Sequence, residues 1–339
     1  MIQRIAIMGA GSLGTILGAY IARCGKDVTL VDVYEEHVKV LNEKGATVVG
    51  GAQFNAAVKA VTPQNMDGTY DLFIYMAKQT YNDTAIPQMV AHCGKDTVIC
   101  CCQNGIPELA VAKQWPKSQI CGAPVGWGAT FKGPGISELT SKEDACSFHL
   151  GSLDGNQYPW IDEVKSILEC MCPTIVSKNL IGDRWSKVLI NAAFSGMSTV
   201  TGGTFGDVMD DEIGIQCLVR IGKETVEVCT VDGVDIVPFA GVDWKEVCTF
   251  KTKEEEDRAK DIFRTGFVPH RALVASMLQD LSKGRKCEIA QIDGVVADMG
   301  DKYGIDTPVT DMVIKIVTEI EEGKRSYSFD NLKEFLPIL

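Results

Sequence analysis

The chain has 339 residues, 45% of them hydrophobic, and a formal net charge of −12 at pH 7. This length suggests two domains and is sufficient for sizeable hydrophobic cores. The acidic balance argues against a surface for nucleic acid or for an anionic membrane, and no apolar window is long enough to predict a membrane span. Because the N-terminus leads directly into a predicted strand, without a signal-peptide pattern, we expect a cytoplasmic protein.

The 13 cysteines occur singly, apart from the run Cys100-Cys101-Cys102 and the pair Cys170/Cys172. No C-x-x-C spacing occurs, so neither a zinc knuckle nor a redox pair is indicated, and no metal site is predicted. We expect reduced thiols, with the triple run acting as small apolar residues in a buried strand.

The first predicted strand, Ile5–Met8, leads into the turn Gly9-Ala10-Gly11-Ser12-Leu13-Gly14 and then into a helical stretch. In this G-x-G-x-x-G pattern the first glycine makes a tight turn, the second leaves room for a pyrophosphate, and the third lets helix and strand pack closely. The helix N-terminus adds N–H groups and a partial positive charge. The turn therefore predicts a dinucleotide site, the alternative being a glycine-rich turn in an unrelated α/β protein.

Asp32 directly follows the second predicted strand, Val28–Val31. A carboxylate at this point can accept the ribose hydroxyls of the adenosine and repels a 2′-phosphate. The next residues, Val33 to Glu36, include no Arg or Lys that could hold such a phosphate. NAD(H) is therefore favoured over NADP(H), unless Asp32 is only an exposed turn or helix-cap residue.

Strands and helices alternate over the rest of the first 180 residues. The further predicted strands are Thr47–Val49, Leu72–Tyr75, Thr97–Cys102, Gln119–Cys121, Ile136–Leu139 and Ser147–Leu150, and the helices are Glu36–Lys44, Ala85–Ala91 and Pro107–Gln114. Gly128–Gly135 is predicted to be a loop followed by an antiparallel extension. This alternation predicts an α/β fold, with an N-terminal Rossmann-like doubly wound sheet over residues 1–181.

From residue 182 to residue 339 the strand signals nearly vanish, which predicts a C-terminal all-helical domain. Asp183 is predicted to cap a helix over Arg184–Ser198. The other predicted helices are Ile213–Asp232, Lys253–Arg264, Arg271–Ser282, Glu288–Tyr303 and Pro308–Glu322; Val237–Lys251 is an irregular connection, and residues 324–339 are a tail with a short helix at Asn331–Phe335.

Polar residues that are candidates for binding or catalysis occur in three places. Lys78 and Asn104 follow predicted strands, where open α/β sheets place their ligands, although either could be an ordinary loop residue. Lys187, Asn191 and Ser195 recur at every fourth position of an apolar helix, so they share one face that lines a ligand cleft or faces solvent.

The third place is the block from Ala275 to Ile289. Ser276 and Gln279-Asp280 share one helix, a basic turn follows, and Glu288 begins the next helix. The simplest role of Glu288 is electrostatic stabilisation of that helix N-terminus.

Taken together, these motifs resemble the ketopantoate reductase (2-dehydropantoate 2-reductase) family. The matching features are the G-x-G-x-x-G turn, the Lys78 and Asn104-Gly105 loops, the W-x-K-x-x-x-N start at Trp185, and the S-M-x-Q-D…G-R-x-x-E-I block from Ser276, which together span residues 1 to about 300. The resemblance implies NAD(P)H-dependent reduction of a 2-oxo acid, most directly 2-dehydropantoate to pantoate.

By this resemblance Lys187 is the catalytic proton donor, and Asn191, Ser195 and Ser276 hold the substrate. Glu288, Lys78 and Asn104 line the cofactor and the junction between domains, with Glu288 also reaching the substrate. The chain departs from the family at Ser195, where a second Asn is frequent, at Val33, where NADPH-using members carry Arg, and in the longer segment Phe239–Arg264.

Two other functions stay open. One is an NAD-dependent D-2-hydroxy acid dehydrogenase of mandelate or branched-chain type, which Asp32 favours. The other is an NAD-sensing regulator without turnover, which would be expected to lose the proton donor or its polar neighbours. The only partner expected besides the dinucleotide is a small-molecule 2-oxo acid, and the helical domain favours a homodimer.

Overall fold

A computed structural model describes residues 1–239 and 241–339 of the chain. They form two compact units, one of Met1–Gln103 with Pro107–Leu180 and the other of Asn104–Ile106 with Ile181–Leu339. Residue 240, which falls within the predicted connection Val237–Lys251 and the longer segment Phe239–Arg264, lies outside the described residues. Each unit has its own hydrophobic core.

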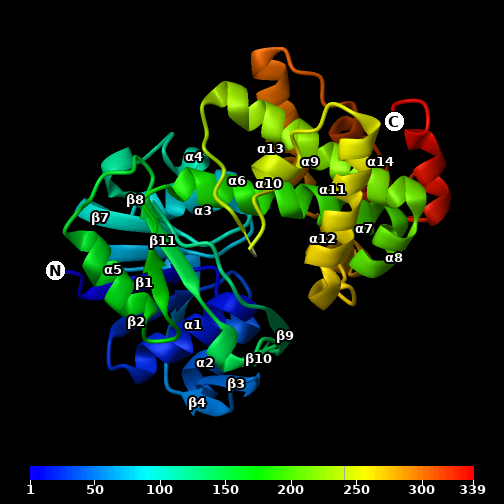
Figure 1. The fold of residues 1–339 in the computed structure, drawn as a ribbon. Coiled ribbons are helices and arrows are strands. Elements are labelled where there is room, and N and C mark those ends of the chain that lie inside the picture. The colour runs from blue at the N-terminus through cyan, green and yellow to red at the C-terminus, as the bar shows by residue number, and fades with distance from the viewer. Residues whose placement is uncertain (240) are drawn as a thin grey trace. The chain divides into compact units, whose positions relative to one another are not determined.

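The first unit is built on an eight-stranded sheet with the order β12-β11-β8-β7-β6-β1-β2-β5 (Figure 1). Its strands are β1 (Arg4–Met8), β2 (Asp27–Val31), β5 (Lys59–Val61), β6 (Tyr70–Tyr75), β7 (Cys93–Cys101), β8 (Ile120–Gly122), β11 (Phe148–Ser152) and β12 (Thr174–Val176). The six strands from β5 to β8 are parallel, and β11 pairs antiparallel with β8. This is the strand order of a dinucleotide-binding Rossmann sheet, so the predicted fold class is confirmed.

A second, four-stranded sheet has the order β4-β3-β10-β9, with β3 (Ala46–Gly50), β4 (Phe54–Ala56), β9 (Ala129–Gly133) and β10 (Ile136–Leu139). The prediction that Gly128–Gly135 is only a loop was wrong, because β9 pairs antiparallel with β10. The predicted strand Thr47–Val49 exists but belongs to this sheet, where β3 runs parallel to β10.

Helix α1 (Ser12–Arg23) is covered on both sides in the first unit. It packs against β1 and β2 of the large sheet and against all four strands of the small sheet. Every residue from Gly14 to Ile21 is buried. A helix that is apolar all round needs such complete cover, which explains why the sequence after the glycine turn has no polar face. The unit's other α-helices are α2 (Glu35–Lys44), α3 (Asn82–Val90), α4 (Glu108–Val111) and α5 (Trp160–Leu168).

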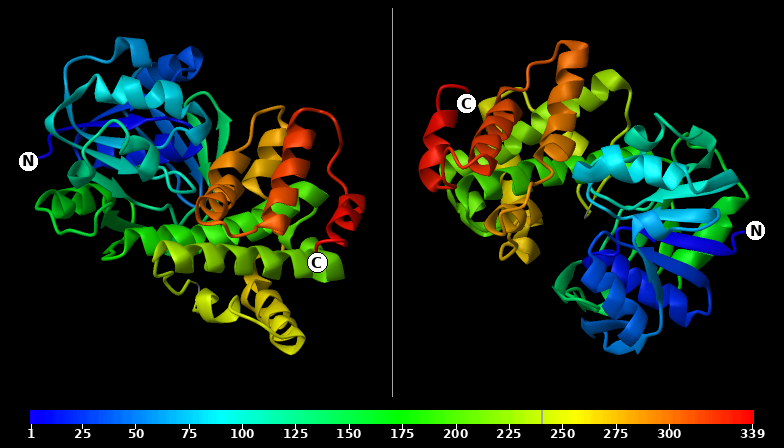
Figure 2. Two further views of the ribbon diagram at one scale, coloured as in Figure 1. Left: turned by 90° about the horizontal axis from the view of Figure 1, so that it is seen from above. Right: turned by 180° about the vertical axis from the view of Figure 1, so that it is seen from behind.

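The second unit is helical, as predicted. Its long helix α9 (Glu212–Asp232) packs against α13 (Ile289–Tyr303) and α14 (Pro308–Glu321) (Figure 2). The side chain of Glu224 on α9 accepts hydrogen bonds from the backbone N–H groups of Val309 and Thr310, both at 2.9 Å, and so caps α14. The remaining α-helices are α6 (Leu180–Ile190), α7 (Met197–Thr201), α8 (Phe205–Asp210), α10 (Trp244–Val247), α11 (Lys253–Gly266) and α12 (Ser276–Ser282).

The helix predicted over Arg184–Ser198 begins earlier than expected, and its hydrogen-bond pattern changes from α-helical to π-helical at Asn191. Asp183 lies inside α6 and does not cap it, because the helix starts at Leu180. The run continues as a π-helical segment, η5 (Asn191–Gly196), before α7. A turn with i→i+5 hydrogen bonds inside an α-helix is rare and is frequently found at functional sites.

Two other predictions for the second unit also need correction. Residues 271–275 are not helical, because the carbonyls of Arg271 and Leu273 accept the N–H groups of Gly206 and Phe205 at the start of α8. The tail is part of the core, since η7 (Phe329–Phe335) buries Leu332 and Phe335. Among the described residues, the structure has no helix whose length and hydropathy would suit a membrane span.

Candidate active site

The first glycine of the turn is required by a close approach of backbone. Gly9 has φ +100°, and a Cβ added there would lie 2.3 Å from the nitrogen of Ala77. The loop after β6 is drawn this close because Met76 and Ala77 both donate backbone hydrogen bonds to the carbonyl of Met8, at 2.8 Å each. The turn after β1 and the loop that leads to Lys78 are therefore fixed together.

The other two glycines have different local reasons. A Cβ on Gly14 would lie 2.1 Å from the carbonyl oxygen of Gly9, so this position must be glycine for α1 to start where it does. A Cβ on Gly11 would meet no heavy atom within 4 Å, and Gly11 precedes α1 without any side-chain cap. An exposed glycine before an uncapped helix N-terminus suits the diphosphate of a dinucleotide. The residues present thus fit the predicted cofactor.

The surface after β2 is acidic. Asp32 is partly exposed, and its Oδ1 accepts a hydrogen bond from the N–H of Tyr34 at 3.0 Å. Asp32 therefore shapes the turn into α2 as well as presenting a carboxylate. Glu35 and Glu36 follow in the first turn of α2, and the next cation, Lys39, is 4.0 Å from Glu43. This set of charges disfavours a 2′-phosphate.

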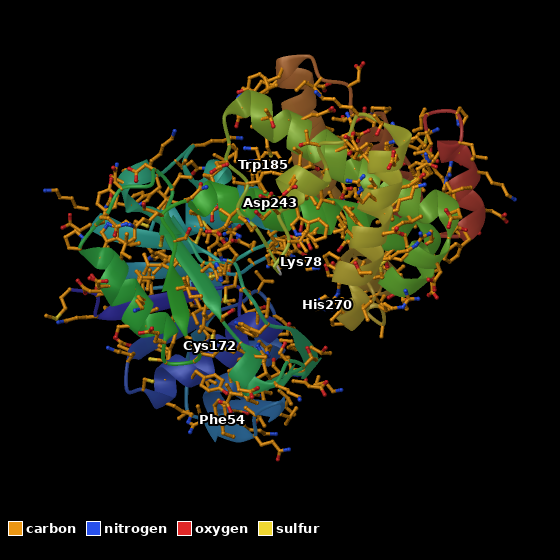
Figure 3. All side chains as sticks on the ribbon, in the orientation of Figure 1. Phe54, Lys78, Cys172, Trp185, Asp243 and His270 are labelled. Carbon is orange, nitrogen blue, oxygen red and sulfur yellow. The ribbon has the colours of Figure 1, made fainter. Side chains whose placement is uncertain are left out.

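Lys78 is partly buried and lies in the loop after β6, just before the short helix η2 (Gln79–Tyr81) (Figure 3). Since β6 is the direct neighbour of β1 in the sheet, Lys78 follows the same edge as the glycine turn. Asn104, in contrast, groups with the helical unit together with Gly105 and Ile106. The structure thus assigns the two loop residues to different units.

Lys187 and Asn191 lie on one continuous helical run of the second unit. From Val188 to Val200 every residue except Asn191 is buried, and Lys187 is also partly exposed. The neighbouring Trp185 anchors this run in the core with an exposed fraction of 1% (Figure 3). Ser195 is buried, and its carbonyl oxygen accepts the hydroxyl of Thr199 at 2.7 Å. A uniform α-helix would place Lys187, Asn191 and Ser195 on one face. Because the π-helical segment begins at Asn191, the spacing of Ser195 along the helix differs from that expectation.

Ser276 and Glu288 flank two helices that touch this segment. Ser276 is exposed at the first position of α12, whereas Glu288 is buried just before α13. Both α12 and α13 pack against η5. The two helices that begin at or just after these residues therefore both contact the π-helical segment that begins at Asn191.

Sequence reasoning missed His37, which is buried on α2 and contacts the glycine turn. The sequence feature that could have indicated it is a histidine on the apolar face of the helix that follows Asp32. Sequence reasoning also missed Asp293, which is buried against η5 on α13.

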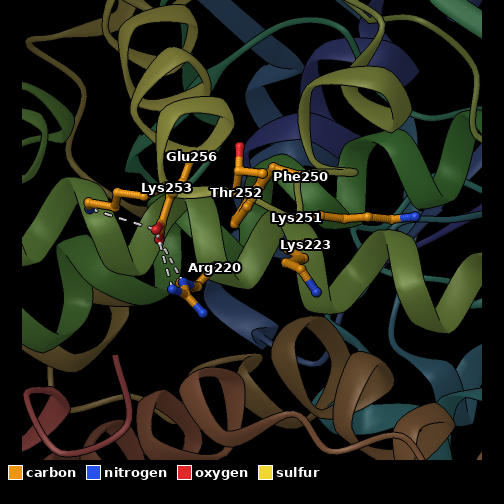
Figure 4. Close-up of a pocket in the computed structure, with 7 residues that line it drawn as sticks. All are labelled: Arg220, Lys223, Phe250, Lys251, Thr252, Lys253 and Glu256. Carbon is orange, nitrogen blue, oxygen red and sulfur yellow. Dashed lines mark hydrogen bonds and ion pairs between the residues drawn. The ribbon is translucent and has the colours of Figure 1, made fainter.

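A surface hollow on the helical unit does not coincide with any predicted site residue (Figure 4). Seven residues line it: Arg220, Lys223, Phe250, Lys251, Thr252, Lys253 and Glu256. Arg220 donates to Glu256 at 2.6 Å, Lys223 pairs with Glu227, and Lys253 lies 3.3 Å from Asp257. Carboxylates therefore balance three of its four cations, namely Arg220, Lys223 and Lys253.

Comparison with known proteins identifies the family. Residues 5–154 match the family model described as ketopantoate reductase PanE/ApbA, and residues 179–321 match the one described as ketopantoate reductase PanE/ApbA C terminal. The chain is 25% identical to the 2-dehydropantoate 2-reductase of Streptococcus pyogenes serotype M18, over 92% of this chain and 96% of that protein. It is 24% identical to the 2-dehydropantoate 2-reductase of Pyrococcus abyssi, over 95% of this chain and 100% of that protein.

Solved structures share the fold. A PanE/ApbA family ketopantoate reductase from Ralstonia eutropha superimposes with a TM-score of 0.80 at 21% identity, covering 95% of this chain and 99% of that chain. A D-mandelate dehydrogenase with NADH and anilino(oxo)acetate superimposes with a TM-score of 0.79 at 24% identity, covering 94% of this chain and 99% of that chain. The chain therefore belongs to the ketopantoate reductase family and is a nicotinamide-dependent oxidoreductase that acts on a CH–OH or keto group.

Proposed function

We propose that the protein reduces 2-dehydropantoate to pantoate with NADH as the favoured reductant. The observation that carries this proposal is the pair Lys187 and Asn191, which are partly exposed on an otherwise buried helical run in a chain of this family. Because both side chains keep part of their surface exposed beside buried apolar neighbours, a small substrate can reach them, which supports a role in binding and catalysis.

Lys187 is the proposed proton donor. The nicotinamide, when bound, supplies the hydride that the carbonyl carbon accepts. The ammonium of Lys187 stabilises the negative charge that develops on the carbonyl oxygen and then protonates it. A cation with protons to donate suits both tasks.

The remaining polar groups orient the substrate. The Asn191 amide holds the carbonyl or hydroxyl oxygen, and the hydroxyl of Ser276, exposed at the start of α12, donates to the substrate carboxylate. Ser195, which is buried in the π-helical segment, is a further proposed substrate ligand, and Glu288 balances the charge of Lys187 or binds hydroxyls. Lys78 and Asn104 complete the cofactor contacts.

Asp32 supports NADH over NADPH. Its carboxylate, followed by Glu35 and Glu36 in the first turn of α2, disfavours the additional phosphate of NADPH. The same feature favours the second candidate, an NAD-dependent D-2-hydroxy acid dehydrogenase of mandelate or branched-chain type. The solved D-mandelate dehydrogenase supports only the shared fold at this identity.

A substrate panel tests the proposal. The purified protein is assayed with 2-dehydropantoate, benzoylformate and 2-oxoisovalerate, each with NADH and with NADPH, and kcat/KM is compared. The highest kcat/KM is expected for 2-dehydropantoate with NADH. A higher value with benzoylformate or 2-oxoisovalerate would establish the dehydrogenase alternative, and binding of NADH without turnover of any oxo acid would favour a regulator. Sedimentation of the same preparation tests the homodimer, which stays a prediction.

A further inference from the structure

His37 joins three segments of the first unit that are far apart in the sequence. Its Nε2 lies 2.8 Å from the carbonyl oxygen of Ala10 in the glycine turn and 3.1 Å from Oγ1 of Thr15 on α1. Its Nδ1 accepts a hydrogen bond from the backbone N–H of Gly135, between β9 and β10, at 2.9 Å. The ring is 1% exposed, so water does not replace these partners.

These contacts fix the protonation state of the ring. A backbone N–H can only donate, so Nδ1 of His37 must carry a lone pair toward Gly135. The proton of the neutral imidazole is then on Nε2, where it is donated to Ala10. The Thr15 hydroxyl donates to the same carbonyl at 2.7 Å, so the Ala10 oxygen accepts two hydrogen bonds.

Holding the Ala10 carbonyl also orients the next N–H group. The described residues contain no cis peptide bond, and in a planar trans peptide the C=O and the following N–H point in opposite directions. The Gly11 N–H therefore points away from His37. Gly11 is also the position where an added Cβ would meet nothing within 4 Å. The histidine thus sets the direction of a donor at the open side of the turn.

We propose that neutral His37 is a positioning residue for the dinucleotide, acting through the Ala10 carbonyl, and that protonating it weakens dinucleotide binding. The proposal rests on the proposed placement of the cofactor at the glycine turn. A second proton on Nδ1 would face the N–H of Gly135, so the ring must move away from Gly135. Because the imidazole is rigid, this movement also draws Nε2 away from the Ala10 carbonyl, whereas the flexible side chain of a glutamine can keep that contact.

The surroundings of His37 favour the neutral form. Burial lowers its pKa from the usual 6.5, and this effect is opposed by the Ala10 carbonyl and by the charge of Asp32. The rings of Tyr34 and Phe131 lie beside it, with centroids at 6.4 Å and 5.2 Å.

Several charges on the neighbouring elements are paired or bonded, and Glu35 and Lys44 of α2 are exposed. On α2, Glu36 accepts the hydroxyl of Tyr34, and Lys39 lies near Glu43. On the small sheet, Lys132 pairs with Glu138. Asp32 is the charged group whose field acts on the ring. Dinucleotide affinity should fall as the pH decreases through the lowered pKa of His37.

Two half-replacements, each of which keeps one of the two hydrogen bonds of His37, separate its role in positioning the dinucleotide site from its support of the fold. His37→Gln keeps a donor at the Nε2 position for Ala10 and loses the acceptor for Gly135, whereas His37→Asn can keep an acceptor for Gly135 and loses the donor. Each loses one hydrogen bond, so both should lower the Tm by a similar amount. The dissociation constant is measured by NADH fluorescence and, as an acid-stable probe, by calorimetry with ADP-ribose, from pH 5.5 to pH 8.

At pH 8, His37→Asn is expected to bind about tenfold more weakly and His37→Gln close to wild type, the loss corresponding to one buried hydrogen bond. The wild type should lose affinity toward pH 5.5, and His37→Gln should not. His92→Gln, a histidine of the same unit whose Nδ1 bonds to Gly68, should keep the wild-type pH profile.

Equal affinities for the two half-replacements, or an unchanged pH profile in His37→Gln, would overturn the role of His37 while leaving the cofactor site standing. Failure of the wild type to bind NADH, NADPH or ADP-ribose at pH 8 would instead overturn the proposed cofactor site, and this inference with it.

Discussion

The Asp293 carboxyl group lies against the backbone of Gly196: a Cβ placed on Gly196 would be 2.7 Å from Oδ1 of Asp293. Gly196 ends the π-helical segment, and Asp293 is on α13. Asp293 is fully buried, and neither of its oxygens has a hydrogen-bond partner among the described residues. The π-helical turn therefore packs on a buried acid as well as on the apolar side chain of Val313.

Asp293→Asn is expected to stabilise the protein at pH 8 and to have little effect at pH 4. Burial raises the pKa of Asp293 well above its usual 3.8, so the native state keeps a proton that the unfolded chain releases. The stability of the wild type therefore falls as pH rises from about 4 through the native pKa. Removing the ionisable group should gain about 1–3 kcal/mol at pH 8, the scale for an unpaired buried polar group.

Urea unfolding at pH 4 and pH 8 measures this difference. Asp298→Asn, at an exposed position of the same helix, is the matched control and should shift neither curve. A gain of equal size at both pH values would show that packing, and not ionisation, explains the effect.

Alanine at Gly14 and at Gly11 should have opposite consequences. Gly14→Ala places a Cβ 2.1 Å from the Gly9 carbonyl and should destabilise by at least about 1–3 kcal/mol, because backbone must move. Gly11→Ala meets open space at an ordinary φ of −62°, so the Tm should stay near that of the wild type while dinucleotide affinity drops about tenfold or more. Calorimetric unfolding and NADH titration check the pair. Full NADH affinity in Gly11→Ala would exclude a ligand that approaches this face of the turn.

Lys187→Ala should lower kcat by about 10²–10⁴-fold, the usual scale for a positioned proton donor, while NADH still binds. Steady-state kinetics with 2-dehydropantoate and an NADH titration separate the two effects. Lys315→Ala, at an exposed position of α14, is the control and should retain turnover. Near-normal kcat in Lys187→Ala would refute its assignment as the donor.

The double change Asp32→Ala with Val33→Arg should move the preference from NADH toward NADPH. It removes a carboxylate that repels the 2′-phosphate and adds a guanidinium at a position that is 74% exposed. The ratio of kcat/KM for the two reductants is the measurement. Glu43→Ala with Lys44→Arg, at exposed positions in the last turn of α2, is the control and should leave the ratio unchanged. An unaltered ratio in the Asp32 variant would show that this carboxylate does not read the ribose.

Local features of the site could be predicted because their causes are local. The φ of Gly9 and the close packing of Gly14 belong to one turn between a strand and a helix, and the spacing of three glycines encodes that turn. The carboxylate at Asp32 and the partly exposed Lys187 and Asn191 likewise follow from strand ends and helical periodicity. The π-helical turn could not be predicted in this way, since it is compatible with the same apolar pattern as an α-helix.

The amino-acid sequence by itself determined the strand–turn–helix that fits a dinucleotide, the acidic end of β2, and the division of the chain into α/β and helical parts. Only the tertiary structure decided that β3 pairs with β10 and that α1 is enclosed by two sheets. It also decided that His37 bonds both to Ala10 and to Gly135, which lies 98 positions after His37. The physical reason is that turns and periodicity depend on neighbouring residues. Hydrogen bonds and packing between distant segments depend on which surfaces meet when the chain folds.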